Sequence, residues 1–324
     1  MRLRFWGTRG SLPVALTAAG LKRKLAQVLV EAKGRHFADT AEAEAWLGSL
    51  PFETAQTYGG HTSCVELEWT QPGSATHEYL LCDLGSGLRP FGNQVLARHG
   101  PQTPNTFHVF LSHLHWDHIM GLPLFAPLYI PGNRVVIHGC HAELEQAIRR
   151  QHSAPCFPVE FAQLPSKIEF VTLEPDHSYD IAGWRVTPKK QLHGGDSYGY
   201  RFERGGKTVV YSTDSEHKLD SAEETEGFVE FFREADVVVF DAMYSLADAV
   251  SMKEDWGHSS NVTGVELCQL AGAKRLLLYH HEPVHGDARI AQVERESQRL
   301  ERITREGHAP LEVIAAWDGL ELDV

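Results

Sequence analysis

The sequence has little cysteine and no two cysteines at a short spacing. Its five cysteines are scattered along 324 residues, and none belongs to a C-x-x-C motif. This pattern excludes a disulfide framework and a zinc ribbon, and it is typical of a reducing compartment. Long apolar runs are missing too: no stretch approaches the roughly 20 apolar residues of a membrane helix, and MRLRFWGTRGSLP has no apolar run after its basic start. We therefore expect a soluble, cytoplasmic protein without a membrane partner.

Positive charge is also scarce. The chain has 30 lysines and arginines against 43 aspartates and glutamates, which gives a formal net charge of −13 at pH 7. Such a surface repels polyanions, so we do not expect long nucleic acid as a partner. A phosphate-bearing substrate would have to be drawn in locally, by cations bound in a cleft.

Histidine, in contrast, is abundant, with 19 residues, and it crowds into LSHLHWDH at 111–118. The run FHVFLS predicts a strand, so His113 and His115, two positions apart near its end, would point to the same side. Trp116 leads into a turn, where Asp117 and His118 can swing back toward the same point. Nitrogen and oxygen ligands of this kind suit zinc, manganese or iron, and so many of them together suit two neighbouring cations.

Short apolar runs rich in β-branched residues predict buried strands at 63–69, 79–85, 106–113, 134–139, 208–214, 236–242 and 275–281. Helical spacing follows at 141–151, 221–235, 261–272 and 287–305. The third helix is well marked, with Ser259, Ser260 and Asn261 as candidate N-caps and Gly272 after its last turn. Early strands followed by alternating strands and helices predict two packed sheets flanked by helices.

One segment differs from the rest of the chain. Residues 17–34 place Leu21, Leu25, Val28, Leu29 and Ala32 on one helical face, and lysines and arginines make the segment basic within an acidic protein. This helix either packs on the body or on a partner subunit, or serves as a lid whose lysines approach an anionic substrate.

The histidine-rich run resembles the H-x-H-x-D-H signature of the metallo-β-lactamase superfamily. The resemblance extends over nearly the whole chain, because FWGTRGSLPV, YGGHTSCVEL, LCDLGSGLR, LSHLHWDHIMGLPLFAPLY, GYRF, VVYSTDSEH, WGHSS and LLLYHHEP follow in the order of its phosphodiesterase branch. That branch contains tRNA 3′-processing endonucleases and cyclic phosphodiesterases. The resemblance implies an α/β fold, the αββα four-layer sandwich with two mixed sheets flanked by helices. It also implies one metallo-hydrolase domain over 1–324, in which about 15–55 is an inserted helical segment.

The resemblance also implies a set of metal ligands. One metal would be held by His113, His115 and His193, the second by Asp117, His118 and His280, and Asp214 would bridge the two. The residues themselves agree for Asp214, which leaves the apolar run TVVYSTD at a strand end. Asp83 and His281 would support the ligands from behind, although the choice of His280 over His281 as the ligand stays open. Asp241 is assigned only a structural role, and the remaining histidines are interpreted as surface or turn residues: His36, His77, His99, His108, His138, His141, His152, His177, His217, His285 and His308.

The implied activity is metal-dependent hydrolysis of a phosphodiester, either a small molecule or a cyclic nucleotide. Two divalent ions, zinc first and manganese or iron as alternatives, would generate a bridging hydroxide. Asp117, Asp214 and His258 form the expected catalytic set, with His258 of WGHSS as the proton donor to the leaving group. A merely structural His258, ordering the turn before the 261–272 helix, is the alternative. Homodimers are expected from the family.

Other functions compete with this one. A tRNA 3′-processing endonuclease would need a basic face or an RNA-gripping arm, for which only the 17–34 helix is available. Thioester and lactone hydrolases share the same ligands. A secreted β-lactamase conflicts with the missing export signal, and a one-iron dioxygenase would leave His118 and His280 without a purpose. A non-catalytic metal-binding scaffold would have no use for the complete ligand set.

Overall fold

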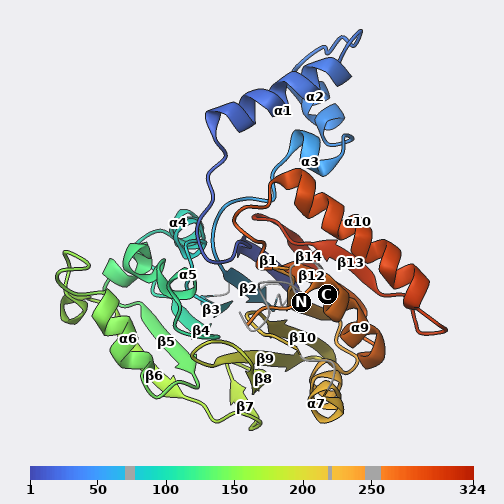
Figure 1. Cartoon of the computed structure of the whole chain (residues 1–324). Helices are drawn as coiled ribbons and strands as arrows, with labels where there is room; N and C mark the ends of the chain where they lie inside the picture. The colour runs from blue at the N-terminus through green and yellow to red at the C-terminus, as the bar shows by residue number, and fades with distance from the viewer. Residues whose placement is uncertain (70–76, 218–220, 245–256) are drawn as a thin grey trace.

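The computed structural model describes residues 1–324 except 70–76, 218–220 and 245–256. Two seven-stranded sheets form its centre (Figure 1). In the first sheet, β14, β1, β2 and β3 are antiparallel neighbours and β3 to β6 run parallel. Its strands, in spatial order, are β14 (Glu321–Asp323), β1 (Arg2–Gly7), β2 (Cys64–Glu68), β3 (Glu78–Cys82), β4 (Thr106–Phe110), β5 (Arg134–Gly139) and β6 (Lys167–Thr172).

The second sheet has the complementary pattern. Its strands β13 to β10 run parallel, and β10 to β7 are antiparallel neighbours. In spatial order they are β13 (Glu312–Ala315), β12 (Arg275–Tyr279), β11 (Val237–Asp241), β10 (Lys207–Ser212), β9 (Ser197–Arg204), β8 (Trp184–Gln191) and β7 (Tyr179–Ile181). Both sheets are therefore mixed, as expected.

Helices cover the outer faces of the sheets. On the first sheet they are α4 (Leu88–His99), α5 (Trp116–Ile119), α6 (Leu144–Gln151) and three short 3-10 helices, η1 (Leu122–Leu124), η2 (Ala126–Tyr129) and η3 (Phe161–Gln163). On the second sheet they are α7 (Ala222–Phe232), α9 (Asn261–Ala271) and α10 (Asp287–Thr304). The predicted αββα sandwich is confirmed.

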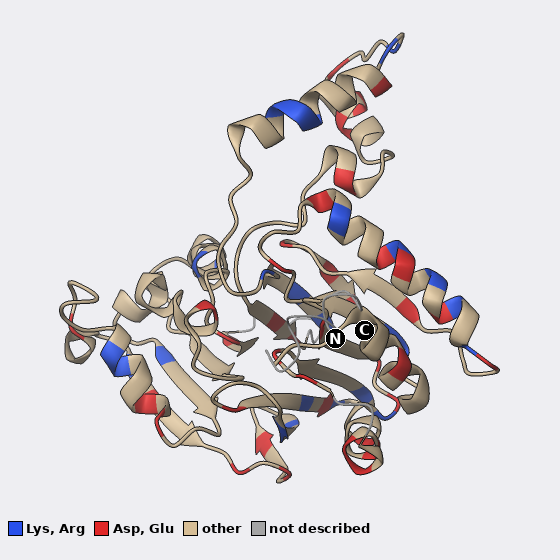
Figure 2. Ribbon diagram, viewed as in Figure 1, with Lys and Arg blue, Asp and Glu red and all other residues tan. Residues whose placement is uncertain are grey.

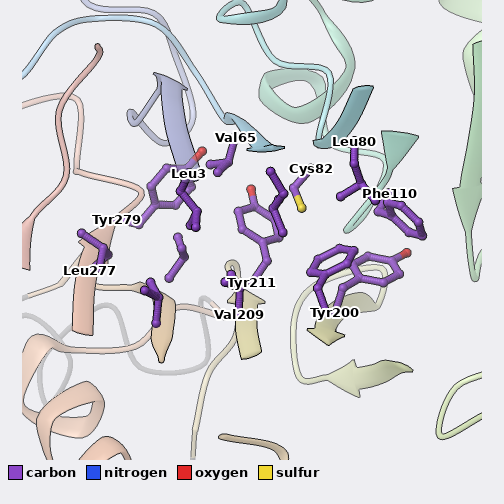
Figure 3. Close-up of a cluster of buried hydrophobic side chains, with 14 of the residues drawn as sticks. Leu3, Val65, Leu80, Cys82, Phe110, Tyr200, Val209, Tyr211, Leu277 and Tyr279 are labelled. Atoms are coloured by element: carbon purple, nitrogen blue, oxygen red, sulfur yellow. The ribbon is translucent and has the colours of Figure 1, made fainter. Parts of the chain in front are cut away.

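Alternation along single strands explains why the strand sequences are apolar throughout. In β10, Val209 and Tyr211 face the other sheet, in the core that also contains Leu3 and Leu277 (Figure 3). The intervening Val210 packs with the side chains of the outer helices. Since neighbouring side chains point to opposite faces and both faces are covered, the last four residues of β10 are all buried.

The caps predicted for α9 are present. Ser260 is the N-cap, and its hydroxyl accepts a hydrogen bond from the backbone N–H of Thr263. Gly272 ends the helix at φ 66°, a left-handed conformation that favours glycine. Against the middle of the helix, a Cβ on Gly264 would lie 2.7 Å from the Phe240 ring, so glycine lets α9 pack closely on β11. These caps and this contact fix the start of α9 next to the ends of the central strands.

Segment 15–55 projects from the body as α1 (Ala18–Glu31), α2 (Thr40–Leu47) and α3 (Phe52–Ala55), and Figure 2 marks basic residues on the α1 ribbon in blue. The predicted apolar face of α1 does not pack on the body: Leu21, Leu25 and Leu29 are 48%, 54% and 71% exposed. The ammonium group of Lys24 instead ties the segment to the body through Asp287, at 2.7 Å. None of the helices in the described part of the chain is long and apolar enough to cross a membrane.

Candidate metal centre

The predicted site residues meet at one edge of the sandwich, where strands of both sheets end. The first sheet contributes the segment after β4, which carries His113, His115, Asp117 and His118. The second sheet contributes His193 after β8, Asp214 after β10 and His280 after β12. Because the carboxyl ends of neighbouring parallel strands lie at one edge, residues far apart in the sequence come together. We call these seven residues, His113, His115, Asp117, His118, His193, Asp214 and His280, the polar cluster.

Four side chains of the polar cluster have the spacing of a tetrahedral metal site. His118 Nε2 lies 3.2 Å from Asp117 Oδ2 and 3.2 Å from Asp214 Oδ2. His280 Nε2 lies 3.2 Å and 3.3 Å from the same two oxygens and 3.2 Å from His118 Nε2. Ligands about 2.0–2.1 Å from a zinc-like ion stand about 3.3 Å apart in a tetrahedron. These four atoms therefore fit one divalent ion.

The remaining three histidines form a second group around the other side of Asp214. His193 Nε2 and His115 Nδ1 are 3.1 Å apart, and both His113 Nε2 and His193 Nε2 lie 3.8 Å from Asp214 Oδ1. His113 Nε2 is buried and has no hydrogen-bond partner. Burial lowers the pKa of His113 well below its usual value, so the imidazole is neutral, the form that binds a metal. An uncompensated buried nitrogen facing a carboxylate is what an ion at this point would satisfy.

Asp214 joins the two groups, with Oδ1 toward one and Oδ2 toward the other. Its backbone has φ 51°, and Asp83 and His280, which also follow strand ends, have φ 61° and 59°. This left-handed conformation is costly for residues with a Cβ and persists where the surrounding structure imposes it. The sharp turns that it allows bring all three side chains back over the sheet edge.

Asp83 holds the cluster in place from inside the protein. Its carboxylate accepts hydrogen bonds from His118 Nδ1 at 2.7 Å, the Tyr211 hydroxyl at 2.7 Å and the backbone N–H of Ser112 at 2.8 Å. The bond to Nδ1 fixes the ring of His118 so that Nε2 faces the cluster. Burial opposes charge on His118, but the carboxylates of Asp214, Asp117 and Asp83 raise the pKa of this imidazole well above its usual value.

His258 lies at the margin of the polar cluster, beside a residue to which the sequence assigned no function. Its Nδ1 donates a hydrogen bond to Asp241 Oδ2 at 2.8 Å, and its ring stacks on His280 with centroids 5.3 Å apart. Burial opposes the charged form, yet Asp241 and Asp214 together raise the pKa of His258 to about 9. The first residue of the WGHSS motif, Trp256, lies outside the described residues, whereas the carbonyl of Gly257 accepts a hydrogen bond from His193 Nδ1 at 2.7 Å.

The structure places His280 and His281 on opposite sides of the chain. His280 Nε2 points into the polar cluster, whereas His281 Nε2 donates to the carbonyl of Ala316 at 2.8 Å and so faces away. Sequence reasoning missed the contact of Asp241 with His258, although an aspartate follows the apolar run in VVVFDA as it does in LLCDLG. It also missed the backbone N–H of Ser11, which donates to Asp117 Oδ2 at 2.7 Å, because no side-chain pattern signals a backbone donor.

The expectation that the other histidines lie at the surface or in turns is wrong for His108 and His138. Four of these rings are buried, those of His108, His138, His141 and His152, but His152 lies in a turn and His141 lies outside the helices and strands. The first two lie on β4 and β5, where both faces of the sheet are covered, and their rings are hydrogen-bonded to each other at 3.2 Å. Burial lowers the pKa of His138 to about 3.

Comparisons with known proteins identify the family. Residues 79–281 match the model of the β-lactamase superfamily domain. The chain is 25% identical over 228 residues to ribonuclease Z of Geobacillus kaustophilus, covering 53% of this chain and 69% of that one. It is 27% identical over 193 residues to the probable metallo-hydrolase YhfI of Bacillus subtilis, covering 56% and 69% of the two chains.

Solved structures show the same fold. The metallo-β-lactamase fold protein YhfI from Bacillus subtilis superposes with a TM-score of 0.63 at 20% identity, covering 99% of this chain and 98% of that one. The short form of human tRNase Z gives a TM-score of 0.54 at 20% identity, with 100% and 99% covered. At this level of identity the likeness concerns the fold alone.

Proposed function

The chain belongs to the β-lactamase superfamily and has the metallo-β-lactamase fold, its named relatives are hydrolases, and from this premise we propose that it is a dinuclear metal-dependent phosphodiesterase. The observation that carries the proposal is Asp214, whose two oxygens face two separate groups of three ligand side chains. The proposed substrate is a small or cyclic nucleotide-type phosphodiester. A net charge of −13 supports a small substrate over a long polyanion.

The residues would hold two divalent ions, with zinc the first choice for this mixture of imidazole and carboxylate and manganese or iron as alternatives. When bound, such a pair supplies a hydroxide at neutral pH and neutralises the charge of a phosphodiester. One ion would be held by His113, His115 and His193, and the other by Asp117, His118 and His280. Asp214 would contribute to both sites. Asp83 keeps His118 oriented, so that the second site does not depend on rotation of a free ring.

His258 is proposed as the proton donor to the leaving oxygen. The hydrogen bond from Nδ1 to Asp241 orients the imidazole and leaves Nε2 to carry the donated proton. Asp241 acts through His258, so it is a positioning residue. Asp117 and Asp214 would hold the ions and offset part of their positive charge. With His258 they complete the proposed catalytic set.

The test is hydrolysis of bis(p-nitrophenyl) phosphate by protein that is stripped of metal and then reloaded with zinc or manganese. Turnover should return with metal and vanish in Asp214→Ala.

His258→Ala should cost roughly 100-fold or more in kcat on esters with alkyl leaving groups and much less on nitrophenyl esters, whose leaving group needs no proton. Asp241→Asn should show the same bias to a smaller degree. Equal losses on both ester types would remove His258 as the acid. Absence of turnover in protein that holds two ions would favour thioester or lactone hydrolysis.

A tRNA 3′-processing endonuclease is the second candidate, favoured by the relatives named ribonuclease Z. Those relatives weigh against our expectation that long nucleic acid is not a substrate. Cleavage of a precursor tRNA by the metal-loaded protein, compared with hydrolysis of a cyclic nucleotide at equal concentration, separates the two candidates. The endonuclease hypothesis requires that the precursor tRNA have a higher kcat/KM than the cyclic nucleotide.

A further inference from the structure

Large apolar side chains remain exposed close to the polar cluster. Leu12, Trp116 and Leu192 are 60%, 75% and 46% exposed. Leu12 follows Ser11, whose N–H binds Asp117, and Leu192 precedes His193. Trp116 stands between His115 and Asp117, two predicted ligands. Exposed apolar surface next to a polar site is typical of ligand recognition rather than of structural packing.

Trp116 differs from the other tryptophans of the described chain. Each of those packs against another aromatic ring: Trp6 on Phe91, Trp46 on Phe37, Trp69 on Trp184, and Trp317 on Phe52. Trp116 has no aromatic partner among the described residues and leaves three quarters of its side chain in solvent. It therefore gains little of the stabilisation that burial of an indole ordinarily provides.

The backbone under Trp116 is nevertheless firmly held. Trp116 is the first residue of α5, and its carbonyl accepts a hydrogen bond from the N–H of Met120 at 2.7 Å. The neighbouring Asp117 is buried and anchored by the N–H of Ser11. The backbone that carries the indole is thus well held. The next residue, Asp117, would bind a metal through its carboxylate.

The exposed member of the polar cluster is the residue next to Trp116 in the chain. Within the groups of possible ligands, His115 is exposed, whereas His113, Asp117, His118 and His280 are buried. A substrate that brings its phosphate to the cluster must therefore approach past His115, next to Trp116.

We infer that Trp116 is a specificity-determining residue that stacks on a planar aromatic group of the substrate, so that the substrate is a phosphodiester of a nucleoside. This inference rests on the proposed function, whose substrate class it narrows. A flat, exposed indole on a well-held backbone matches a nucleobase, because bases stack face to face on aromatic side chains. The stacking would hold the nucleoside while the polar cluster holds the phosphate.

The experiment compares two esters with the same leaving group: thymidine 5′-(p-nitrophenyl) phosphate, which carries a base, and methyl p-nitrophenyl phosphate, which does not. The wild-type protein should prefer the thymidine ester by kcat/KM. Trp116→Ala should reduce this preference by 10-fold or more, through KM, whereas Trp116→Phe should retain most of it. Leu270→Ala, which removes an apolar side chain that is 56% exposed on α9, is the matched control and should keep the wild-type preference. Metal content of each variant verifies that the flanking ligands are intact.

A second measurement keeps the two proposals distinguishable. Thymidine monophosphate should quench the tryptophan fluorescence of the metal-loaded wild-type protein, and Trp116→Phe should lose that quenching. If the esters are hydrolysed but Trp116→Ala changes the rates on both equally, the stacking inference is wrong and the phosphodiesterase stands. If neither ester is hydrolysed, the proposed function fails, and the quenching alone decides whether Trp116 stacks on a nucleoside. Quenching that depends on Trp116 would support a nucleotide site. Absence of quenching would overturn the inference.

Discussion

At the scale of residues, the buried carboxylates differ in what compensates them. Asp83 accepts hydrogen bonds from an imidazole, a phenol and a hydroxyl. Glu66 on β2 is only 1% exposed, and its one described side-chain donor is the indole N–H of Trp6, at 3.0 Å. Burial raises the pKa of Glu66 to about 7, since one neutral donor does not replace the water that an ionised carboxylate loses.

This raised pKa predicts a pH-dependent stability. Below pH 4.5 the carboxyl is neutral in both the folded and the unfolded protein. Between pH 4.5 and pH 7 the folded protein binds a proton that the unfolded chain has released, so stability falls as the pH rises. Above pH 7 the decrease in the free energy of unfolding is complete and amounts to roughly 3 kcal/mol. Glu66→Gln should therefore raise the free energy of unfolding at pH 8.5 and leave it nearly unchanged at pH 4.

Urea unfolding of chelated protein at the two pH values measures the effect without interference from metal binding. Glu44→Gln, at an exposed position on α2, is the control and should keep the wild-type difference between the two pH values. A Glu66→Gln protein whose stability falls as steeply with pH as that of the wild type would show that Glu66 is ionised when folded.

Among the site residues, those inside the H-x-H-x-D-H run were predictable, because four candidate ligands, three histidines and an aspartate, within six positions have no other common use. The pairing of His258 with Asp241 was not predictable. The two residues are 17 positions apart, and their contact depends on how β11 and the start of α9 meet in space. His280 and His281 could not be separated from the sequence either, because the left-handed φ of 59° at His280 decides which ring turns inward.

At the scale of elements, the strands and the α9 caps followed from local patterns, whereas the environment of α1 did not. The periodicity of Leu21, Leu25 and Leu29 marks an amphipathic face, but periodicity does not say which face meets the body. Lys24 decides this: its ammonium group also donates to the carbonyls of Glu53 and Gln56, at 2.5 Å and 2.7 Å. With this lysine turned toward the body, the leucine-lined face beside it on the helix is left to solvent.

Removing the ammonium group should loosen the projecting segment. Hydrogen bonds to a charged group contribute about 1.5–3 kcal/mol each, so Lys24→Met should speed local opening of α1 by 10-fold or more. Hydrogen–deuterium exchange of peptides from 17–32 measures this opening. Lys22→Met is the matched control, because Lys22 is an exposed lysine of the same helix, two positions before Lys24. Equal exchange rates in the two variants would mean that the tie to Asp287 does not hold the segment.

At the scale of the whole molecule, the polar cluster spans the two sheets. Four of its members follow β4 in the first sheet, and the other three follow strands of the second. The negatively charged carboxylates and the uncompensated imidazoles at this junction oppose the docking of the two sheets. Bound cations would instead favour docking, because both sheets would contribute ligands to them.

Metal removal should therefore destabilise the entire fold. An ion present at 100 times its dissociation constant stabilises the folded state by about 2.7 kcal/mol, so chelation should lower the Tm by several degrees. Thermal unfolding with a chelator, and then with excess zinc or manganese, measures the shift. The difference should largely vanish in Asp214→Ala, which removes the shared ligand. A wild-type Tm that ignores both chelator and metal would contradict a site that joins the sheets.

The chain passes from the first sheet to the second between β6 and β7, and only the short strand β14 returns. A cut near residue 175 would thus divide the protein into two fragments, each with one sheet and an incomplete ligand set. Neither fragment could hold both ions alone, but the mixture could. Catalytic turnover would then serve as a reporter of fragment reassembly, and closure of one sheet on the other could be timed by the uptake of metal.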